Sequence, residues 1–295
     1  MRDSFLSRCD LYRLAFIMIK LLKLSVTFLL FVATSALALP FGSQSALVID
    51  ENSGEVVLEK NSENIVPIAS LTKLMTAMVV LDAKLDMEEA ISIDVHDVDT
   101  IKHSTSRVPV GATMPRKDVL QLALMSSDNR AAAALARTYP GGIDAFESAV
   151  HAKLTVLGMS HTTIEEPTGL SFHNTSTAAD LVKMASAASQ YPDITRITTD
   201  SRDLINIKGR KVEYHNTNGF VGKKGWDIML SKTGYTTEAG RCIIMKIKAA
   251  GKNFIMVLLN ASANSMRSRD AMNVRRFLSN DKLALDKPRH IKSSI

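Results

Sequence analysis

Hydrophobic and polar residues alternate in short blocks near the start of the globular part of the chain. The apolar runs at 45–50 and 55–59 are separated by the polar, glycine-containing stretch 51–54, which predicts a β-hairpin. Residues 71–83 follow as a stretch with almost no polar face. A helix that is hydrophobic on every side has to be surrounded by protein, so we expect this one at the centre of the fold.

The remaining pattern changes from helical in the middle of the chain to strand-like near its end. Residues 86–107 show little helical periodicity and are expected to form strands and loops. Helices are predicted at 115–136, interrupted by the loop-prone stretch 126–129, and at 144–157, 178–189 and 267–278, and strands at 227–232, 242–248 and 253–260. Strands at both ends with helices between them predict an α+β protein in which the two ends share one sheet.

The first part of the chain has a different character. Between Arg2 and Lys23 there are five basic and two acidic residues, and an uncharged apolar run at 24–39 contains an Ala-Leu-Ala sequence that ends at Ala38. This order of charged, apolar and small residues predicts a cleavable secretory signal peptide. An uncleaved membrane anchor is the other interpretation, but the run is shorter than the roughly 20 residues that a spanning helix needs.

The predicted signal peptide covers residues 1–38, and Met18 is an alternative start because a complete signal follows it. Residues 39–280 are then expected to form one catalytic domain and residues 281–295 a short polar tail. We expect a periplasmic protein that is soluble or loosely associated with the membrane.

Composition and charge narrow the class of protein further. A chain of 295 residues with 46% hydrophobic residues, 14 glycines and two cysteines is neither disordered, nor collagenous, nor a disulfide framework. The formal net charge of +6 falls once the basic leader is removed, so nucleic acid is not expected as a partner. Cys242 lies in an apolar run and is predicted to be a buried core residue. The seven histidines form no His-Glu-x-x-His pattern, and we expect neither a metal nor another cofactor.

Three short motifs carry candidate chemistry: Ser70-Leu71-Thr72-Lys73, Ser127-Asp128-Asn129 and Lys232-Thr233-Gly234. Alone, Ser70 has an ordinary explanation as a helix cap, Lys73 as a solvated helix charge and Ser127-Asp128-Asn129 as a turn. Ser-x-x-Lys is expected roughly once by chance in a chain of this length, whereas Lys-Thr-Gly is expected in about one such chain in fifteen. The specificity therefore lies in the order of the motifs and in their suitable local structure.

The chemistry asked of these residues is nucleophilic catalysis. Ser70 and Lys73 are three residues apart on a helix and therefore share one face, so the amine can take the hydroxyl proton. Lys73 acts as a base only when neutral, and we expect burial and the nearby charge of Lys232 to lower its pKa. The backbone N–H groups of Ser70 and Tyr235 are predicted to form an oxyanion hole, with Gly234 leaving room for substrate.

The motifs resemble those of the penicillin-binding serine D-alanyl-D-alanine peptidases of bacterial cell walls. Beyond the motifs, the chain is similar to the low-molecular-mass branch called penicillin-binding protein 7, whose members are D-alanyl-D-alanine endopeptidases. The similar segments are 67–83, 122–134, 139–142, 166–170, 173–180 and 232–240. The resemblance spans roughly residues 45–280. It implies the fold shared by β-lactamases and penicillin-binding transpeptidases, with an antiparallel sheet flanked by helices and an all-helical lobe.

The resemblance also implies a role for each motif residue. Ser70 would be the acyl-ester nucleophile, Lys73 the proton acceptor, Ser127 a proton relay, Asn129 a ligand of the substrate backbone, and Lys232, Thr233 and Gly234 the binding site for the substrate carboxylate end. The implied partners are peptidoglycan stem peptides, β-lactam inhibitors and other wall hydrolases. Asp128 differs from the residue often found in that branch, but its side chain is not required to point toward the substrate.

Several activities share these motifs. Related carboxypeptidases place an arginine on the strand after Lys-Thr-Gly, and the matching stretch 259–262 has none, which favours an endopeptidase over a carboxypeptidase. Arg241 or Arg267 could substitute for that arginine from elsewhere in the chain. A β-lactamase needs a deacylation base, for which Glu165 or Glu166 is a candidate, but the following Pro-Thr-Gly-Leu resembles the connector of the peptidase branch. A non-catalytic penicillin sensor is the third alternative.

Overall fold

The computed structural model of the protein describes residues 41–285. The predicted signal peptide and the predicted tail beyond residue 285 lie outside the described residues.

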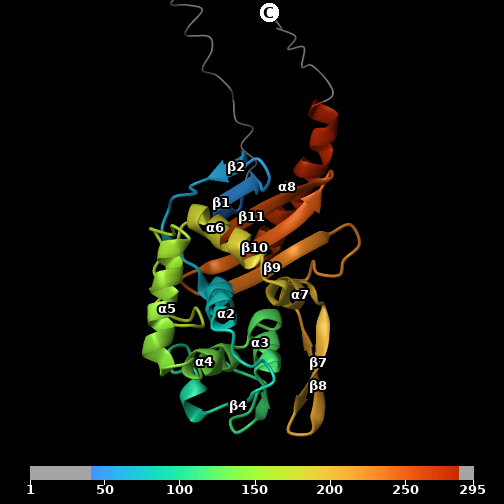
Figure 1. Ribbon diagram of the computed structural model, residues 1–295. Coiled ribbons are helices and arrows are strands. Elements are labelled where there is room, and N and C mark those ends of the chain that lie inside the picture. The colour runs from blue at the N-terminus through green and yellow to red at the C-terminus, as the bar shows by residue number, and fades with distance from the viewer. Residues whose placement is uncertain (1–40, 286–295) are drawn as a thin grey trace, which may run out of the picture. The chain divides into compact units, whose positions relative to one another are not determined.

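A five-stranded antiparallel sheet is built from both ends of the described chain (Figure 1). Its strands are β1 (Ser43–Asp50), β2 (Val56–Lys60), β9 (Asp227–Thr236), β10 (Gly240–Ala249) and β11 (Lys252–Ala261), in the spatial order β2-β1-β11-β10-β9. β1 pairs with β11, with Leu47 opposite Val257, so the prediction that the two ends share one sheet is confirmed. β9 is an edge strand, and its outer edge is free to face other elements.

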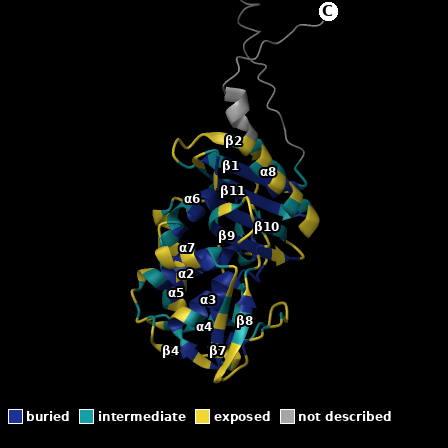
Figure 2. Cartoon of the chain, turned by 90° about the vertical axis from the view of Figure 1, so that its right-hand side faces the viewer, coloured by how far each residue is buried: buried dark blue, intermediate teal, exposed yellow. Residues whose placement is uncertain are grey.

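The helices form a lobe beside the sheet and also cover its two faces. They are η1 (Ala69–Thr72), α2 (Lys73–Asp82), η2 (Val95–Asp97), α3 (Arg116–Met125), α4 (Asn129–Arg137), α5 (Gly142–Val156), α6 (Ala178–Ala188), α7 (Pro192–Thr199) and α8 (Asn264–Leu285). α6 and α8 lie on opposite faces of the sheet (Figure 1, Figure 2). The fold is therefore the α+β architecture that the sequence predicts.

Short strands connect these parts. β3 (Val66–Pro67) pairs with β6 (Thr175–Ser176), β4 (Ala90–Ser92) with β5 (Thr113–Pro115), and β7 (Arg202–Ile207) with β8 (Arg210–His215). The sequence analysis did not anticipate α7 or the β7–β8 hairpin, because both are short and neither has a long apolar run.

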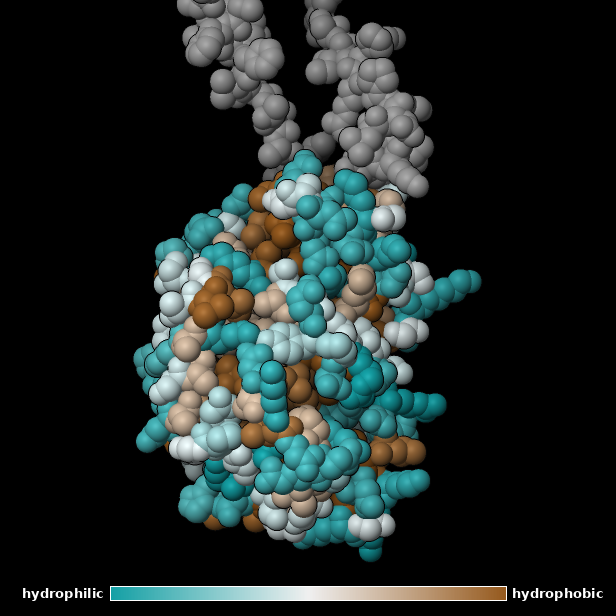
Figure 3. Space-filling model, viewed as in Figure 1, coloured by the Kyte–Doolittle hydropathy of each residue, from teal (hydrophilic) through white to brown (hydrophobic). Residues whose placement is uncertain are grey.

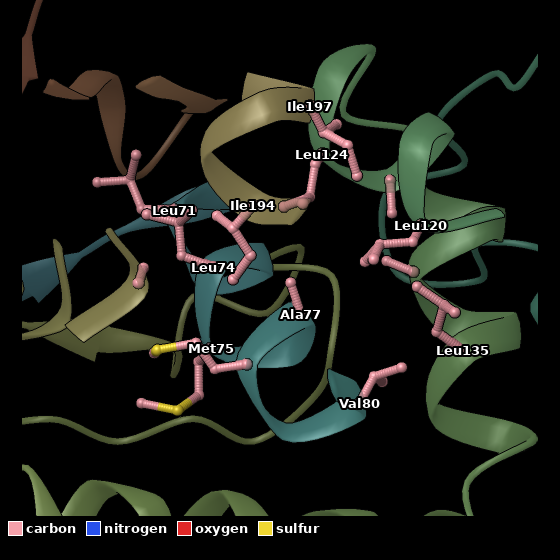
Figure 4. Close-up of a cluster of buried hydrophobic side chains, with 14 of the residues drawn as sticks. Leu71, Leu74, Met75, Ala77, Val80, Leu120, Leu124, Leu135, Ile194 and Ile197 are labelled. Atoms are coloured by element: carbon pink, nitrogen blue, oxygen red, sulfur yellow. The ribbon is translucent and has the colours of Figure 1, made fainter. Parts of the chain in front are cut away.

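The hydrophobic core of the helical lobe surrounds α2. Leu71, Leu74, Met75 and Val80 are completely buried, and Figure 4 shows them in one cluster with labelled side chains of α3, α4 and α7. The predicted central helix is thus confirmed, although residues 69–72 form a separate 3₁₀ turn before α2 begins. Outside this core, hydrophilic side chains dominate the face in Figure 3, with hydrophobic residues in separate patches.

The start of β1 is fastened to α8. The carboxylate of Asp270 accepts hydrogen bonds from the backbone N–H of Gly42 at 3.0 Å, from that of Ser43 at 2.6 Å and from Ser43 Oγ at 2.7 Å. α8 continues to Leu285, beyond the boundary expected at residue 280. Among the described residues no helix is long and apolar enough to cross a membrane.

Candidate active site

Ser70 lies in η1, held between the edge strand β9 and the loop that follows Glu166. A Cβ atom on Gly234 would lie 3.1 Å from the backbone nitrogen of Ser70, and one on Gly169 would lie 2.0 Å from the carbonyl oxygen of Ala69. Only glycine permits so close an approach from both sides. Ala69 itself has a φ of 48°, a strained value for a residue with a side chain. The nucleophile is therefore presented by a tightly constrained backbone.

The amine of Lys73 has three partners, and their chemistry orients its lone pair. Nζ lies 2.9 Å from Ser70 Oγ, 2.7 Å from Asn129 Oδ1 and 2.6 Å from the carbonyl oxygen of Thr168. The last two are carbonyl oxygens, which only accept hydrogen bonds. A neutral amine donates its two N–H groups to them, and its lone pair is left facing the hydroxyl of Ser70. This is the arrangement that a base needs.

The surroundings of Lys73 also favour the neutral amine. Its side chain is 1% exposed. Burial lowers the pKa of Lys73 from 10.5 to about 8, against the charges of Glu166, Asp128 and Asp99, which raise it. The expected contribution of burial is thus present, whereas the charge of Lys232, which was also expected to lower this pKa, is not among its causes. The three carboxylates, which the sequence did not predict, limit the shift.

Ser127 and Lys232 form a second hydroxyl–amine pair. Lys232 Nζ donates to Ser127 Oγ at 2.8 Å and to the carbonyl oxygen of Thr233 at 3.0 Å. Ser127 has a φ of 60°, so at this position the strained residue itself carries the hydroxyl. Burial, followed by the charges of Lys73 and Arg267, holds the pKa of Lys232 well below its ordinary value. Like charges in one buried site disfavour simultaneous protonation of both lysines.

The middle motif is positioned by the start of α4. Asp128 caps this helix by accepting from the N–H of Ala131 at 3.0 Å, and it also accepts from Ser106 Oγ at 2.6 Å, so its side chain is occupied by structural contacts. Asn129 Nδ2 donates to Ser104 Oγ at 2.8 Å while Oδ1 bonds Lys73. One N–H of the Asn129 amide therefore remains for a ligand.

The third motif lies on β9, which runs past the predicted end at residue 232 and continues to Thr236. Gly234 packs directly against η1, so its missing side chain makes room for the protein backbone there. It also lines the cleft. Thr233 Oγ1 bonds Thr217 Oγ1 at 2.7 Å. Tyr235 is 52% exposed, and its ring carries the guanidinium of Arg241 at 3.5 Å from the ring centroid.

A cleft of about 660 Å³ brings most of the predicted residues together. We call it the catalytic cleft, and it is lined by Ser70, Ser127, Asn129, Thr233, Gly234 and Tyr235, together with residues of the 102–104 loop, Leu170, Thr217, Thr236, Thr237, Arg241, Asn264 and Arg267. Lys73 and Lys232 are buried beneath this lining. No group of three or more potential metal ligands occurs in residues 41–285.

Comparisons with known proteins decide the family. The D-alanyl-D-alanine carboxypeptidase model of peptidase family S11 matches residues 32–263. This chain belongs to that family. A D-alanyl-D-alanine endopeptidase of Pseudomonas aeruginosa is 43% identical over 273 residues, covering 88% of each chain, and one of Escherichia coli is 41% identical over 253 residues, covering 85% of this chain and 82% of the relative. The DD-transpeptidase of Streptomyces K15 shares the fold, with a TM-score of 0.75, 22% identity, and coverage of 81% of this chain and 98% of that chain.

As an S11 peptidase the protein is a serine hydrolase, and its site contains residues that the sequence analysis had not assigned. Arg267 projects from α8 into the catalytic cleft and is 8% exposed. Its guanidinium donates to the carbonyl oxygen of Cys242 at 3.1 Å and to Asn264 Oδ1 at 2.5 Å, while Nε has no hydrogen-bond partner among residues 41–285. The stretch 259–262 indeed lacks arginine, but the cleft does not.

Cys242 itself is fully buried, as predicted.

The loop after Glu166 was also missed as a structural part of the S11 site. One carboxylate oxygen of Glu166 accepts from the N–H groups of Gly169 at 2.6 Å and Leu170 at 2.8 Å, and the other accepts from the N–H of Thr168 at 2.7 Å. These bonds fold the loop so that the Thr168 carbonyl meets Lys73. Glu166 is thus committed to holding the loop, which argues against its being the deacylation base of a β-lactamase.

Replacing Gly169 with Ala is expected to slow acylation of Ser70 by about tenfold to a hundredfold, because the new Cβ must push the Ala69 carbonyl and displace the nucleophile. Gly158→Ala is the matched control, since Gly158 also has a positive φ of 63° but no atom within 4 Å of the added Cβ. Both variants carry the backbone strain, of about 1 kcal/mol. Acylation by a fluorescent penicillin, measured beside the melting temperature, separates the two effects. Equal acylation rates in both variants would show that Gly169 does not position Ser70.

Proposed function

We propose that this chain is a penicillin-sensitive, periplasmic serine endopeptidase that hydrolyses D-alanyl cross-links of peptidoglycan through an acyl-enzyme on Ser70. The observation that carries the mechanism is the Lys73 amine, whose carbonyl partners leave its lone pair directed at Ser70 Oγ. The two relatives above 40% identity are both named endopeptidases, which supports the substrate class. The predicted signal peptide supports export.

In the proposed acylation step Lys73 takes the hydroxyl proton while Ser70 Oγ attacks the D-alanyl carbonyl carbon. The resulting oxyanion is stabilised by the backbone N–H groups of Ser70 and Tyr235. The C–N bond then breaks, and the leaving nitrogen needs the proton that Lys73 has taken. Ser127, whose hydroxyl bonds Lys232, relays that proton. Water attacks the ester in the second step, with Lys73 again as base, and Ser70 is released.

The carboxylate of the leaving residue would bind at the cationic end of the cleft. Lys232 and Arg267 lie there, and the pKa of Lys232 is lowered partly by the charge of Arg267. A substrate carboxylate bound between Lys232 and Arg267 would offset their repulsion and raise the pKa of Lys232, which favours its protonated form. Thr233 adds a hydroxyl beside them. Asn129 would bind the substrate backbone on the other side of Ser70 through its remaining N–H.

The preference for cross-links rests on the relatives and not on a missing arginine. Arg241 and Arg267 both line the cleft, so a free carboxylate has cations to bind, and a carboxypeptidase activity shares the acylation step. A β-lactamase is disfavoured because Glu166 is occupied by its loop. A penicillin sensor needs the same base for its own acylation, so turnover of a peptide substrate is the measurement that separates a peptidase from a sensor. Other wall hydrolases remain proposed partners.

Cross-linked muropeptide dimers are expected to be cut to monomers faster than D-alanine is released from pentapeptide monomers. The reason is the identity of more than 40% to two relatives that are named D-alanyl-D-alanine endopeptidases. Both rates are measured by chromatography on one preparation, with Ser70→Ala as the blank. Faster release of D-alanine would make the protein a carboxypeptidase, and turnover of penicillin at a rate comparable to its acylation would make it a β-lactamase.

A further inference from the structure

The side-chain amide of Asn129 determines where the lone pair of Lys73 points. Its Oδ1 accepts from Lys73 Nζ at 2.7 Å, which leaves the lone pair for the hydroxyl of Ser70. If the amide were turned end for end, its NH₂ group would face Lys73 and donate to that lone pair. An N–H of Lys73 would then point at Ser70, and the hydroxyl proton would have no acceptor. The amide therefore has one productive orientation and one unproductive orientation.

Ser104, in the loop between η2 and β5, lies on the other side of this amide. Its Oγ accepts from Asn129 Nδ2 at 2.8 Å. A hydroxyl can donate as well as accept, so it would tolerate either orientation of the amide unless its own proton were directed elsewhere. The partner of the Ser104 proton thus decides how Asn129 is oriented.

Asp99 is the acceptor for that proton. Its Oδ2 accepts from the backbone N–H of Ser104 at 2.7 Å, and its Oδ1 from those of Ile101 at 2.8 Å and Lys102 at 3.0 Å. Burial raises the pKa of Asp99, but a hydrogen bond from the Ser104 hydroxyl and those from the three backbone N–H groups hold it below its ordinary value. An ionised carboxylate only accepts, so the hydroxyl of Ser104 donates to Asp99 and can only accept from Asn129.

Building on the proposed role of Lys73 as the base, we propose that Asp99 and Ser104 are positioning residues that hold the amide of Asn129 in its productive orientation. Through this amide they direct the lone pair of Lys73 at Ser70. Neither of them gains or loses a proton in the reaction. The order of donors and acceptors, from the carboxylate to the nucleophile, is set by groups in a loop outside the three motifs.

Removal of the Ser104 hydroxyl should change the pH dependence of acylation in a way that a general structural defect would not. The reversed amide suits only the neutral amine, because an ammonium has no lone pair to accept the N–H. In Ser104→Ala this additional, unproductive neutral state should lower the pKa of Lys73 below about 8. The ratio of productive amine to ammonium stays the same, so the rate at low pH is preserved and only the plateau at high pH falls.

The charged groups around Lys73 are unchanged in this variant. Glu166, Asp128 and Asp99 raise its pKa, and Lys232 shares its buried site. A shift in the pH profile of Ser104→Ala therefore reports the loss of the hydroxyl and not a loss of charge.

The test measures the second-order rate constant of acylation by a fluorescent penicillin at pH 6 and at pH 9. Ser104→Ala should match the unmodified protein at pH 6 and be about three- to tenfold slower at pH 9, the effect of one lost hydrogen bond. Ser104→Thr keeps a hydroxyl and should restore the unmodified rate at pH 9. Melting temperatures verify that the variants are folded.

Ser106→Ala is the matched control. Ser106 lies in the same loop and donates to Asp128 Oδ2 at 2.6 Å, and this carboxylate has no hydrogen bond to Lys73 in the described part of the chain. Its rate at pH 9 should stay that of the unmodified protein.

Four results would each overturn the proposal: an equal loss at both pH values in Ser104→Ala, no loss at pH 9, no rescue by Ser104→Thr, or the same loss in Ser106→Ala. A rate that is independent of pH in the unmodified protein would instead contradict the role of Lys73 in the proposed function.

Discussion

The Ser70→Ala protein is expected to remain folded and to take up no penicillin. Within the described part of the chain Ser70 Oγ has a hydrogen bond only to Lys73, so its removal should change the free energy of unfolding by about 1 kcal/mol or less. Without the hydroxyl no acyl ester can form, and hydrolysis of cross-linked dimers should fall by a factor on the order of 10⁴ or more. Intact-protein mass spectrometry after incubation with penicillin measures the first effect directly.

Ser127 is the internal control for this experiment. Ser127 is a second hydroxyl in the same cleft and is bonded to a lysine of its own, at 2.8 Å. Transfer of the label to Ser127 in the Ser70→Ala protein would show that the nucleophile had been assigned to the wrong pair. Retained folding is verified by an unchanged melting temperature.

Lys73→Ala is expected to slow acylation by 10²- to 10⁴-fold, the range for loss of a positioned general base. Lys73→Arg should be no faster, because a guanidinium stays protonated. In the unmodified protein the acylation rate should rise about tenfold per pH unit below pH 8 and level off above it. The direction follows from the lowered pKa of about 8, since only the neutral amine accepts the proton and its fraction grows until the pKa is passed.

Lys246→Ala is the control variant that shows the effect of removing a buried lysine outside the active site. It lies on β10, is almost fully buried, and bonds Glu51 at 2.7 Å and Ser189 at 3.1 Å, far from the cleft lining. Lys246→Ala should lower the melting temperature without changing the acylation rate or its pH profile. A Lys73→Arg enzyme with nearly full activity, or a rate independent of pH between 6 and 8, would mean that another group is the base.

The order of apolar runs was enough to predict the sheet and the central helix, because residues 71–83 and the three last strands have unambiguous patterns. The motif residues were likewise predictable, since their side chains do the chemistry. The groups that the sequence did not predict act through backbone atoms or through contacts between segments far apart in the sequence. The Thr168 carbonyl, which bonds Lys73 across 95 positions of sequence, is shared by every residue type and leaves no signal in the sequence.

Arg267 was named from the sequence only as an arginine that could substitute from elsewhere, and its place in the cleft was not predicted for a related reason. Its helix begins just beyond the last strand, and a sequence pattern alone does not indicate that the first turn of α8 faces the cleft. Gly234 was recognised as part of the motif, but its contact with the protein backbone was not predicted. The space freed by its missing side chain is filled by the backbone of Ser70, a contact between segments that only the closed fold brings together.

The pairing of β1 with β11 determines when the sheet can form during synthesis of the chain. β1 is complete as soon as residue 50 has been made, yet its neighbour β11 ends at Ala261 and the carboxylate that fastens it belongs to Asp270. Loop closure over such a separation comes late, because the intervening chain must be ordered first. A polypeptide that emerges with its amino end first therefore cannot close its sheet, or bring Lys232 beneath Ser70, until nearly all of it is available. Nucleophile and base are adjacent from the start, but the serine remains without its full surroundings until synthesis, and any transfer across a membrane, is almost finished.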